Sequence, residues 1–200
     1  SSGADFHHRP WLDFNCCQSG HAGFDAPNYQ LIEEDHARAP AKPCLDSEPR
    51  YEDHPVMSPG WQALPGCFFD AHAVRVAAYH AVFAGACGHT YGAHAVWQCH
   101  DPALRPAINH ARTDWREALR LPGAAQMGHL RRLVEARPAR FDRVPDQALI
   151  VSARHVGSMH RRACRDAART WAMVYVPWEG DVALDLAGFA AARLAAAWFD

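Results

Sequence analysis

Acidic side chains are concentrated in residues 42–53, directly after a short apolar run. The four carboxylates of this cluster are Asp46, Glu48, Glu52 and Asp53. Pro49 lies among them and prevents a helix or a central strand from continuing through the cluster. Many enzymes present a catalytic carboxylate where a strand ends. We therefore predict a strand at 43–46, and we interpret Glu48, which Pro49 would hold rigidly just beyond it, as the catalytic carboxylate.

Glycoside hydrolysis is the chemistry that these residues fit best. One carboxyl group protonates the leaving oxygen while another attacks the sugar or activates water. Aromatic rings stack on the C–H faces of sugars, and His and Gln bind hydroxyl groups. Besides Glu48, we predict eight residues that bind a carbohydrate substrate: Gln18, His21, Asp46, Tyr51, Glu52, His89, Tyr91 and Trp97. The alternative is that Glu48 or Glu52 only pairs with Arg50 or caps a loop.

His89 and His94 raise the further alternative of a metal site. Together with His21 and Asp46 they could ligate a metal ion, as in barrel metallohydrolases. However, the chain contains 14 histidines, so some clustering is expected, and the spacing of His89 and His94 matches no metal-binding signature. We therefore predict neither a metal nor another cofactor.

Three apolar runs of strand length, at 11–17, 43–46 and 86–90, each lead into polar or aromatic side chains. Helical patterns follow these runs, and we expect helices at 29–37, 71–85 and 124–136. Asn28 and Asp70 precede the first two helices and have side chains that are preferred at N-caps. The repeat of strand, loop and helix is typical of βα units. In a (β/α)₈ barrel the carboxyl ends of all strands open on one face, so we expect these polar groups to converge on one pocket.

The hydrophobic period changes beyond Pro138 from helical to alternating. Ala148–Val151 is strand-like, and apolar side chains alternate with smaller ones in 171–175, which indicates antiparallel strands at hairpin spacing. We therefore predict an α/β protein with two domains. Residues 1–138 would be the C-terminal part of a (β/α)₈ TIM barrel, and residues 145–200 an antiparallel β-sandwich that is truncated at its C-terminus.

Two other stretches are interpreted from local composition alone. Residues 54–69 contain several Pro and Gly residues, and we expect a long loop there. Arg161 and Arg162 are interpreted as part of a solvated face.

The overall composition excludes several classes of protein. Apolar residues make up 49% of the chain, charged residues make up 21%, and the formal net charge is −2. This balance is typical of a globular core and gives no reason to expect a nucleic acid or a membrane surface as a partner. The seven cysteines include no C-x-x-C pair, so we interpret them as small buried hydrophobic residues and not as a disulfide framework. The sequence determines neither the oligomeric state nor the cellular location.

The ends of the chain suggest a part of a longer protein. The chain begins with Ser-Ser-Gly-Ala and ends with Trp-Phe-Asp, and three βα units cannot close a barrel. We therefore expect further barrel strands upstream of Ser1, and we expect residues 1–200 to fold poorly alone because their sheet would have open edges.

Four collinear stretches resemble the apiosidase-like glycoside hydrolase family. They are Pro10–Asn15 with Gln18–His21, Lys42–Asp53, Phe83–Gly92 with Trp97–Gln98, and Leu121–Met127. The tail from about residue 145 is similar to the β-sandwich domain that commonly follows in this family and is named after collagen binding. We take that label as a name and not as an activity.

The resemblance implies a (β/α)₈ barrel that removes a glycosyl residue, such as apiose, from a branched pectic side chain. It implies that Glu48, the Glu of Asp-x-Glu-Pro, is the nucleophile of a retaining mechanism. The acid/base of the family is an Asp on an earlier strand, and no residue of this chain corresponds to it, so we expect this chain alone to be inactive. The second hypothesis is a carbohydrate-binding protein without catalysis, and the third is a barrel metallohydrolase.

Overall fold

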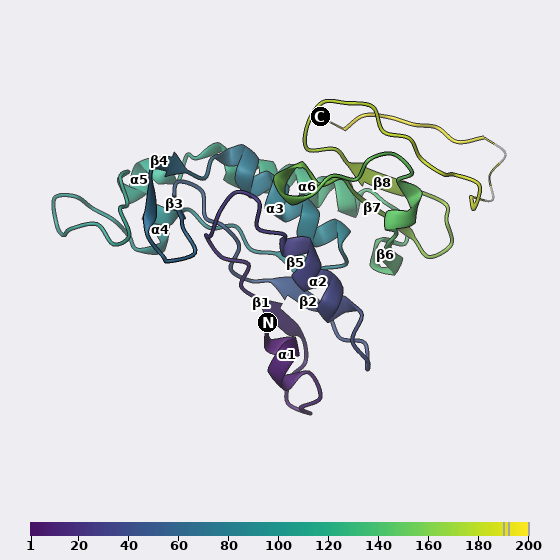
Figure 1. Cartoon of the computed structure of the whole chain (residues 1–200), viewed down its shortest axis with the longest axis horizontal. Helices are drawn as coiled ribbons and strands as arrows, with labels where there is room; N and C mark the ends of the chain where they lie inside the picture. The colour runs from purple at the N-terminus through teal and green to yellow at the C-terminus, as the bar shows by residue number, and fades with distance from the viewer. Residues whose placement is uncertain (190, 192, 200) are drawn as a thin grey trace.

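Three short parallel strands form the central sheet in the order β1 (Asn15–Cys17), β2 (Cys44–Asp46) and β5 (Gly88–His89) (Figure 1). The computed structural model describes residues 1–189, 191 and 193–199. Residues 190, 192 and 200 of the predicted sandwich therefore lie outside the described part. The register pairs Cys17 with Asp46 and Asp46 with His89. The three predicted strands are confirmed, although each is shorter than predicted.

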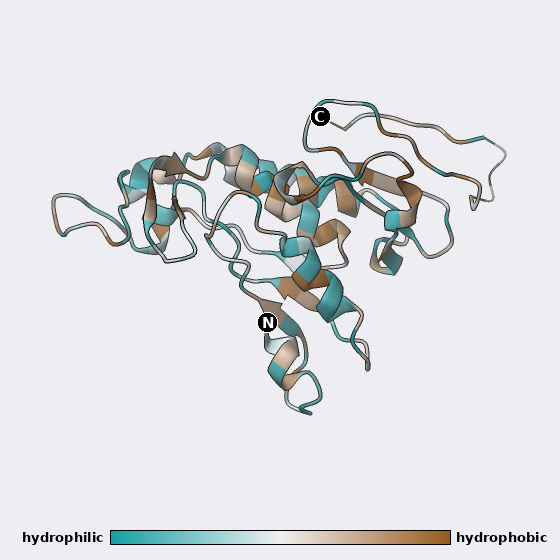
Figure 2. Cartoon of the chain, in the orientation of Figure 1, coloured by the Kyte–Doolittle hydropathy of each residue, from teal (hydrophilic) through white to brown (hydrophobic). Residues whose placement is uncertain are grey.

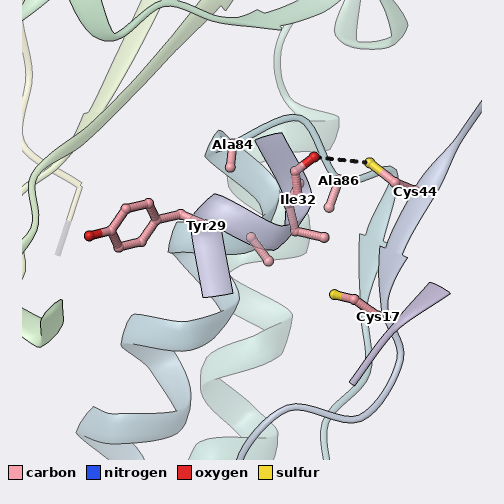
Figure 3. Close-up of a cluster of buried hydrophobic side chains, with 7 residues drawn as sticks. Cys17, Tyr29, Ile32, Cys44, Ala84 and Ala86 are labelled. Carbon is pink, nitrogen blue, oxygen red and sulfur yellow. Dashed lines mark hydrogen bonds between the residues drawn. The ribbon is translucent and has the colours of Figure 1, made fainter. Parts of the chain in front are cut away.

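The helices α2 (Asn28–His36) and α3 (Ala71–Phe83) cover one face of this sheet. Because successive side chains of a strand point to opposite faces, Asp46 shares the helix-facing side of β2 with Cys44, and Leu45 faces the other way. Figure 3 shows the apolar cluster between strands and helices, which contains Cys17, Tyr29, Ile32, Cys44, Ala84 and Ala86.

The N-caps of the helices agree only in part with the sequence. Asp70 accepts a hydrogen bond from the Ala73 backbone N–H at 2.8 Å and caps α3 as predicted. The predicted Asn28 cap is wrong, because Asn28 is the first residue of α2 and its side chain makes no cap hydrogen bond. Helix α6 (Pro122–Glu135) begins earlier than predicted, since its first residue is Pro122, and proline is favoured in the first turn of a helix.

The predicted loop at 54–69 is wrong, because these residues form an antiparallel hairpin of β3 (Pro55–Met57) and β4 (Ala63–Phe68). Pro55 stands at the first position of β3, where the missing N–H removes no essential ladder bond. The hairpin is joined to the segment after β1, since the Met57 N–H donates to the His21 carbonyl at 2.9 Å. The remaining short helices are α1 (Ser2–Phe6), α4 (His94–Trp97), α5 (Trp115–Ala118), η1 (Arg140–Asp142), η2 (Gln147–Leu149) and η3 (Gly157–Met159).

The C-terminal region contains a three-stranded antiparallel sheet of β6 (Arg143–Pro145), β7 (Arg162–Asp166) and β8 (Ala172–Tyr175). The alternation in 171–175 is confirmed as β8. The predicted strand at 148–151 is replaced by the turn of η2 and a single bridge from Ile150 to Leu184.

The interpretation of Arg161 and Arg162 as a solvated face is wrong. Both arginines are buried, with 7% and 2% of their surface exposed. Arg162 belongs to β7, and its guanidinium lies 2.6 Å from the Glu33 carboxylate of α2. A long-range ion pair, which the local sequence does not reveal, makes this burial possible.

Helix α3 packs against both α6 and the C-terminal sheet. The shared core consists of Ala78, Tyr79, Val82, Phe83, Leu130, Cys164 and Met173. The rings of Tyr79 and Tyr175 stack with centroids 4.4 Å apart. Figure 2 shows hydrophobic residues on the central strands and on the C-terminal sheet. The structure is thus mixed α/β, with one parallel and two antiparallel sheets in the described residues, while the TIM-barrel part and the sandwich stay predictions.

The seven cysteines all carry free thiols. Cys17, Cys44 and Cys164 are buried as expected, but Cys87 and Cys99 are exposed. In the described part of the chain, no helix combines the length and the apolar character needed to span a membrane.

Candidate active site

Glu48 lies two residues beyond β2 and is partly exposed. Its backbone carbonyl accepts a hydrogen bond from the Gly20 N–H at 3.1 Å, which joins it to the segment after β1. The predicted alternative, an ion pair with Arg50, is wrong. The buried Arg50 guanidinium instead donates to the carbonyls of Phe24 and Ala26 at 2.8 and 2.9 Å. The Glu48 carboxylate is therefore not neutralised by the cation nearest to it in sequence.

Tyr51 stands beside Glu48, and His21 packs against Tyr51. Burial and the neighbouring Glu48 carboxylate raise the pKa of Tyr51 to about 12, so its hydroxyl keeps its proton and can donate to that carboxylate. The His21 ring packs edge-on against Tyr51 with centroids 4.6 Å apart. Burial lowers the pKa of His21 to about 3, so the ring is neutral, and its buried Nε2 has no hydrogen-bond partner.

A row of rings extends from His21 through the interior. His21 contacts His54 at 4.0 Å and His54 contacts His94 at 4.2 Å, measured between ring centroids. Two indoles lie at the ends of the row, Trp61 at 6.4 Å from His21 and Trp97 stacked at 6.1 Å from His94. These indoles are 54% and 55% exposed. Exposed rings backed by rigid neighbours are suited to stacking against a sugar.

Asp46 and His89 lie behind the strand ends, on the side of α2. Asp46 is completely buried, and its Oδ2 accepts hydrogen bonds from Ser19 Oγ at 2.8 Å and from Asn28 Nδ2 at 3.0 Å. His89 Nδ1 lies 4.0 Å from the same oxygen, and burial lowers the pKa of His89 to about 4. These contacts are internal and fix Asp46, two residues before Glu48. Substrate binding by Asp46 and His89 stays a prediction.

The buried Glu52 and the half-buried Tyr91 form a second pair. Glu52 Oε2 accepts hydrogen bonds from the Tyr91 hydroxyl at 2.6 Å and from the Gly123 N–H at 2.9 Å. The latter bond caps α6, whose own N-cap residue, Leu121, makes no side-chain cap. Burial raises the pKa of Glu52. Glu52 also lines a cavity of about 310 Å³ together with Asp53 and other residues. These contacts are structural, and substrate binding by Glu52 and Tyr91 likewise stays a prediction.

The structure therefore brings together some of the predicted residues and separates others. Glu48, Tyr51 and His21 form one group, and the exposed Gln18 directly follows β1, the strand beside β2. Trp97 joins this group through the row of rings.

Arg50, His54 and Trp61 were not predicted as parts of this group. His54 and Arg50 were detectable, because both stand inside or beside the acidic cluster at 42–53. Trp61 was not, because it lies in the turn of the missed hairpin, and only the long-range pairing of that hairpin with His21 brings it to the site.

Metal binding receives no support from the geometry. Within residues 1–189, 191 and 193–199, no group of three or more His, Cys, Asp or Glu side chains is arranged so that it could hold a metal ion.

Two family models match consecutive parts of the chain. The model described as "Apiosidase-like, catalytic domain" matches residues 1–140, and the model described as "Putative collagen-binding domain of a collagenase" matches residues 144–200. No curated protein matches the chain.

Two solved structures are similar to the chain over almost all of its length. One is described as a glycoside hydrolase, and the other as a glycoside hydrolase family 5 protein from Bacteroides vulgatus. Each is 32% identical to this chain, with a TM-score of 0.86 over 96% of it. The chain spans only 45% and 44% of the lengths of these two proteins.

Proposed function

We propose a function from the premise that this chain belongs to the apiosidase-like family of glycoside hydrolases. In this proposal the chain supplies the nucleophile side of a retaining glycosidase site, and Glu48 is the nucleophile. The observation that carries it is the state of Glu48: a partly exposed carboxylate at the end of β2, free of Arg50 and backed by Tyr51 and His21. A carboxylate held in this way can approach a sugar from one side.

The proposed reaction has two steps. A Glu48 oxygen attacks the anomeric carbon and forms a glycosyl ester while the leaving oxygen takes a proton from a second carboxyl group. Water then attacks the same carbon, gives a proton to that second group, and releases Glu48. Because the chain spans less than half of its solved neighbours, we assign the second carboxyl group to an Asp on a barrel strand outside residues 1–200. The residues 1–138 would then form the C-terminal half of the barrel.

The neighbours of Glu48 have separate roles in this proposal. Tyr51 stays protonated and orients the attacking carboxylate by a hydrogen bond. His21, whose buried ring packs edge-on against Tyr51, holds that tyrosine in place. Trp97 and Trp61 stack on sugar rings. The substrate class that we propose is a plant-type polysaccharide or oligosaccharide side chain with a terminal sugar such as apiose.

The substitution Glu48→Gln in the full-length protein tests the proposal. It should lower kcat on a panel of aryl glycosides that includes an aryl apioside by roughly 10³-fold or more, because the nucleophile is lost. Sugar binding, measured by calorimetry, should persist. The matched control is Glu117→Gln, an equal charge change at an exposed position of α5, which should leave kcat unchanged.

Chemical rescue gives a second readout. Glu48→Ala should regain part of its rate in sodium azide and yield a glycosyl azide of inverted configuration, because azide replaces the missing carboxylate. A wild-type rate in Glu48→Gln would overturn the proposal, because another group would then carry the reaction. A wild-type protein that binds sugars and cleaves none of the panel would instead favour a carbohydrate-binding protein without catalysis.

A further inference from the structure

The C-terminal region contacts α2 through a matched set of side chains. Three pairs join the segment Ser158–Arg162 to α2 and the residues just before it: Ser158 with Asp25, His160 with Tyr29, and Arg162 with Glu33. Tyr29 and Glu33 are one helical turn apart, about 6 Å along the axis. His160 and Arg162 are alternate residues of an extended segment, which advances by about 6.6 Å. The rise between Tyr29 and Glu33 on the helix thus matches the rise between His160 and Arg162 on the extended segment. This match allows both pairs to be made at the same time.

The Asp25–Ser158 pair is closely packed against the backbone of Gly157. Asp25 Oδ1 accepts hydrogen bonds from the Ser158 N–H at 2.9 Å and from Ser158 Oγ at 2.7 Å, and these bonds lower the pKa of Asp25. Gly157 has a φ of +59° and lies so close to Asp25 that a Cβ atom there would overlap the carboxylate. Glycine is thus required both by the backbone conformation and by the close approach.

The second pair is buried on both sides, and in the third Arg162 is buried while Glu33 is partly exposed. The rings of His160 and Tyr29 stack with centroids 4.0 Å apart and planes 14° apart. The His160 carbonyl accepts a hydrogen bond from His80 Nε2 of α3 at 2.7 Å, which extends the contact to the second helix that covers the sheet. Arg162 lies 2.6 Å from Glu33. The segment therefore fixes α2 against α3 from outside.

Residues 24–28, which include Asp25 and the start of α2, also contact the residues on both sides of Glu48. Asn28 Nδ2 donates to Asp46 Oδ2 at 3.0 Å and to the Ala77 carbonyl at 2.8 Å. The carbonyls of Phe24 and Ala26, which flank Asp25, accept the two hydrogen bonds of Arg50. Residues 24–28 thus touch the chain two residues before and two residues after Glu48.

We propose that the segment Ser158–Arg162 is a positioning element of the active site, which holds residues 24–28 and thereby Asp46 and Arg50 on both sides of Glu48. This inference rests on the proposed role of Glu48. It gives the C-terminal region, whose family is named after collagen binding, a task inside the enzyme itself. Asp25 and Ser158 are positioning residues, because neither reaches the reacting atoms.

Asp25→Ala in the full-length protein tests this. Removal of the acceptor should lower kcat roughly 3- to 10-fold with KM changed less than about 2-fold, since small misplacements of a reacting group cost rate. Asp25→Asn, which keeps an acceptor oxygen, should restore most of kcat. Asp13→Ala, at an exposed position, is the control and should match the wild type. An unchanged kcat in Asp25→Ala would overturn the inference.

Amide hydrogen exchange separates this inference from the proposed function. In Asp25→Ala, peptides that cover 46–51 should exchange faster than in the wild type, while peptides from α6 should not change. This result does not depend on what Glu48 does. If exchange at 46–51 is unchanged although Glu48→Gln is inactive, the positioning role is wrong and the proposed function stands.

Discussion

Two glutamates of the same acidic stretch, Glu48 and Glu52, each neighbour a tyrosine, and their environments differ. Glu52 is 2% exposed, and its Oε2 accepts hydrogen bonds from Tyr91 and from the Gly123 N–H. Glu48 is partly exposed and stands beside Tyr51 without an ion pair to Arg50. The residue types are equal, so type alone does not decide which carboxylate is available for chemistry. The partners distinguish the two: Glu52 stabilises the start of α6, while Glu48 stays partly exposed, as the proposed nucleophile requires.

The backbone explains how four residues separate these two environments. The Glu52 N–H donates to the Gly92 carbonyl at 2.8 Å, and the Glu52 carbonyl accepts from the His94 N–H at 2.9 Å. Glu52 is thereby fixed next to the segment after β5, which directs its side chain to α6. Glu48 precedes this pairing and lies in the bend after β2, where its carbonyl accepts one hydrogen bond, from the Gly20 N–H.

The largest expected difference between the pairs is in stability. Glu52→Ala should lower the free energy of unfolding by roughly 2–4 kcal/mol, because two buried donors lose their acceptor. Glu48→Ala should change it by less than about 1 kcal/mol. Urea unfolding of both variants measures this. Equal losses in the two variants would remove the distinction between a structural and a reactive carboxylate.

Gly123 tests the close contact at the start of α6. A Cβ atom there would overlap Glu52 Oε2 and lie 2.8 Å from Val74 Cγ2, so Gly123→Ala should destabilise the protein by about 1–3 kcal/mol. Gly128 lies in the same helix with only the flexible end of Arg132 nearby. Gly128→Ala should therefore be neutral or stabilise by up to about 1 kcal/mol. Thermal unfolding should show a lowered Tm for Gly123→Ala and an unchanged or raised Tm for Gly128→Ala. An unchanged Tm in Gly123→Ala would contradict this contact.

The buried His21 predicts loss of stability in acid. Its folded pKa, about 3, lies below the ordinary value of 6.5, so the unfolded chain binds the proton more strongly. Stability is therefore full above pH 6.5 and falls as the pH drops towards 3, by up to about 1.4 kcal/mol per pH unit for this group. His21→Gln should flatten the decline, and His8→Gln, at an exposed position, should not. Identical acid profiles of wild type and His21→Gln would exclude this cause.

The smallest expected effects come from the two hydroxyl groups. Tyr91→Phe should cost about 0.5–1.5 kcal/mol of stability through the lost bond to Glu52 and leave kcat nearly unchanged. Tyr51→Phe should do the reverse and lower kcat a few-fold, because the nucleophile is less well oriented. Kinetics and unfolding curves of both variants check this. A stability loss confined to Tyr51→Phe would contradict the assignment of Tyr91 to stability and of Tyr51 to catalysis.

Local patterns predicted the parts of the fold that local interactions determine. The short apolar runs, the Asp70 cap and the alternation in 171–175 all appear in the structure. The prediction failed where distant partners decide. Asn28 serves Asp46 instead of a helix end, and Arg162 is buried because Glu33 compensates its charge.

The same division applies to the candidate site. Glu48, Tyr51 and His21 were predicted from residue types and spacing. In the structure Tyr51 neighbours both Glu48 and His21, and the roles of the three residues stay predictions. Nothing in the spacing distinguished Glu52 from Glu48, because the N–H that engages Glu52 comes from Gly123, far along the chain.

The most direct test of the central claim is to trap the glycosyl ester. The full-length enzyme is incubated with an activated 2-deoxy-2-fluoro glycoside of the sugar that it cleaves best, and the modified peptide is sequenced by mass spectrometry. We predict one sugar adduct per active site, on Glu48. An adduct on Glu52 or on any other carboxylate, or an active enzyme that forms no adduct, would contradict the account.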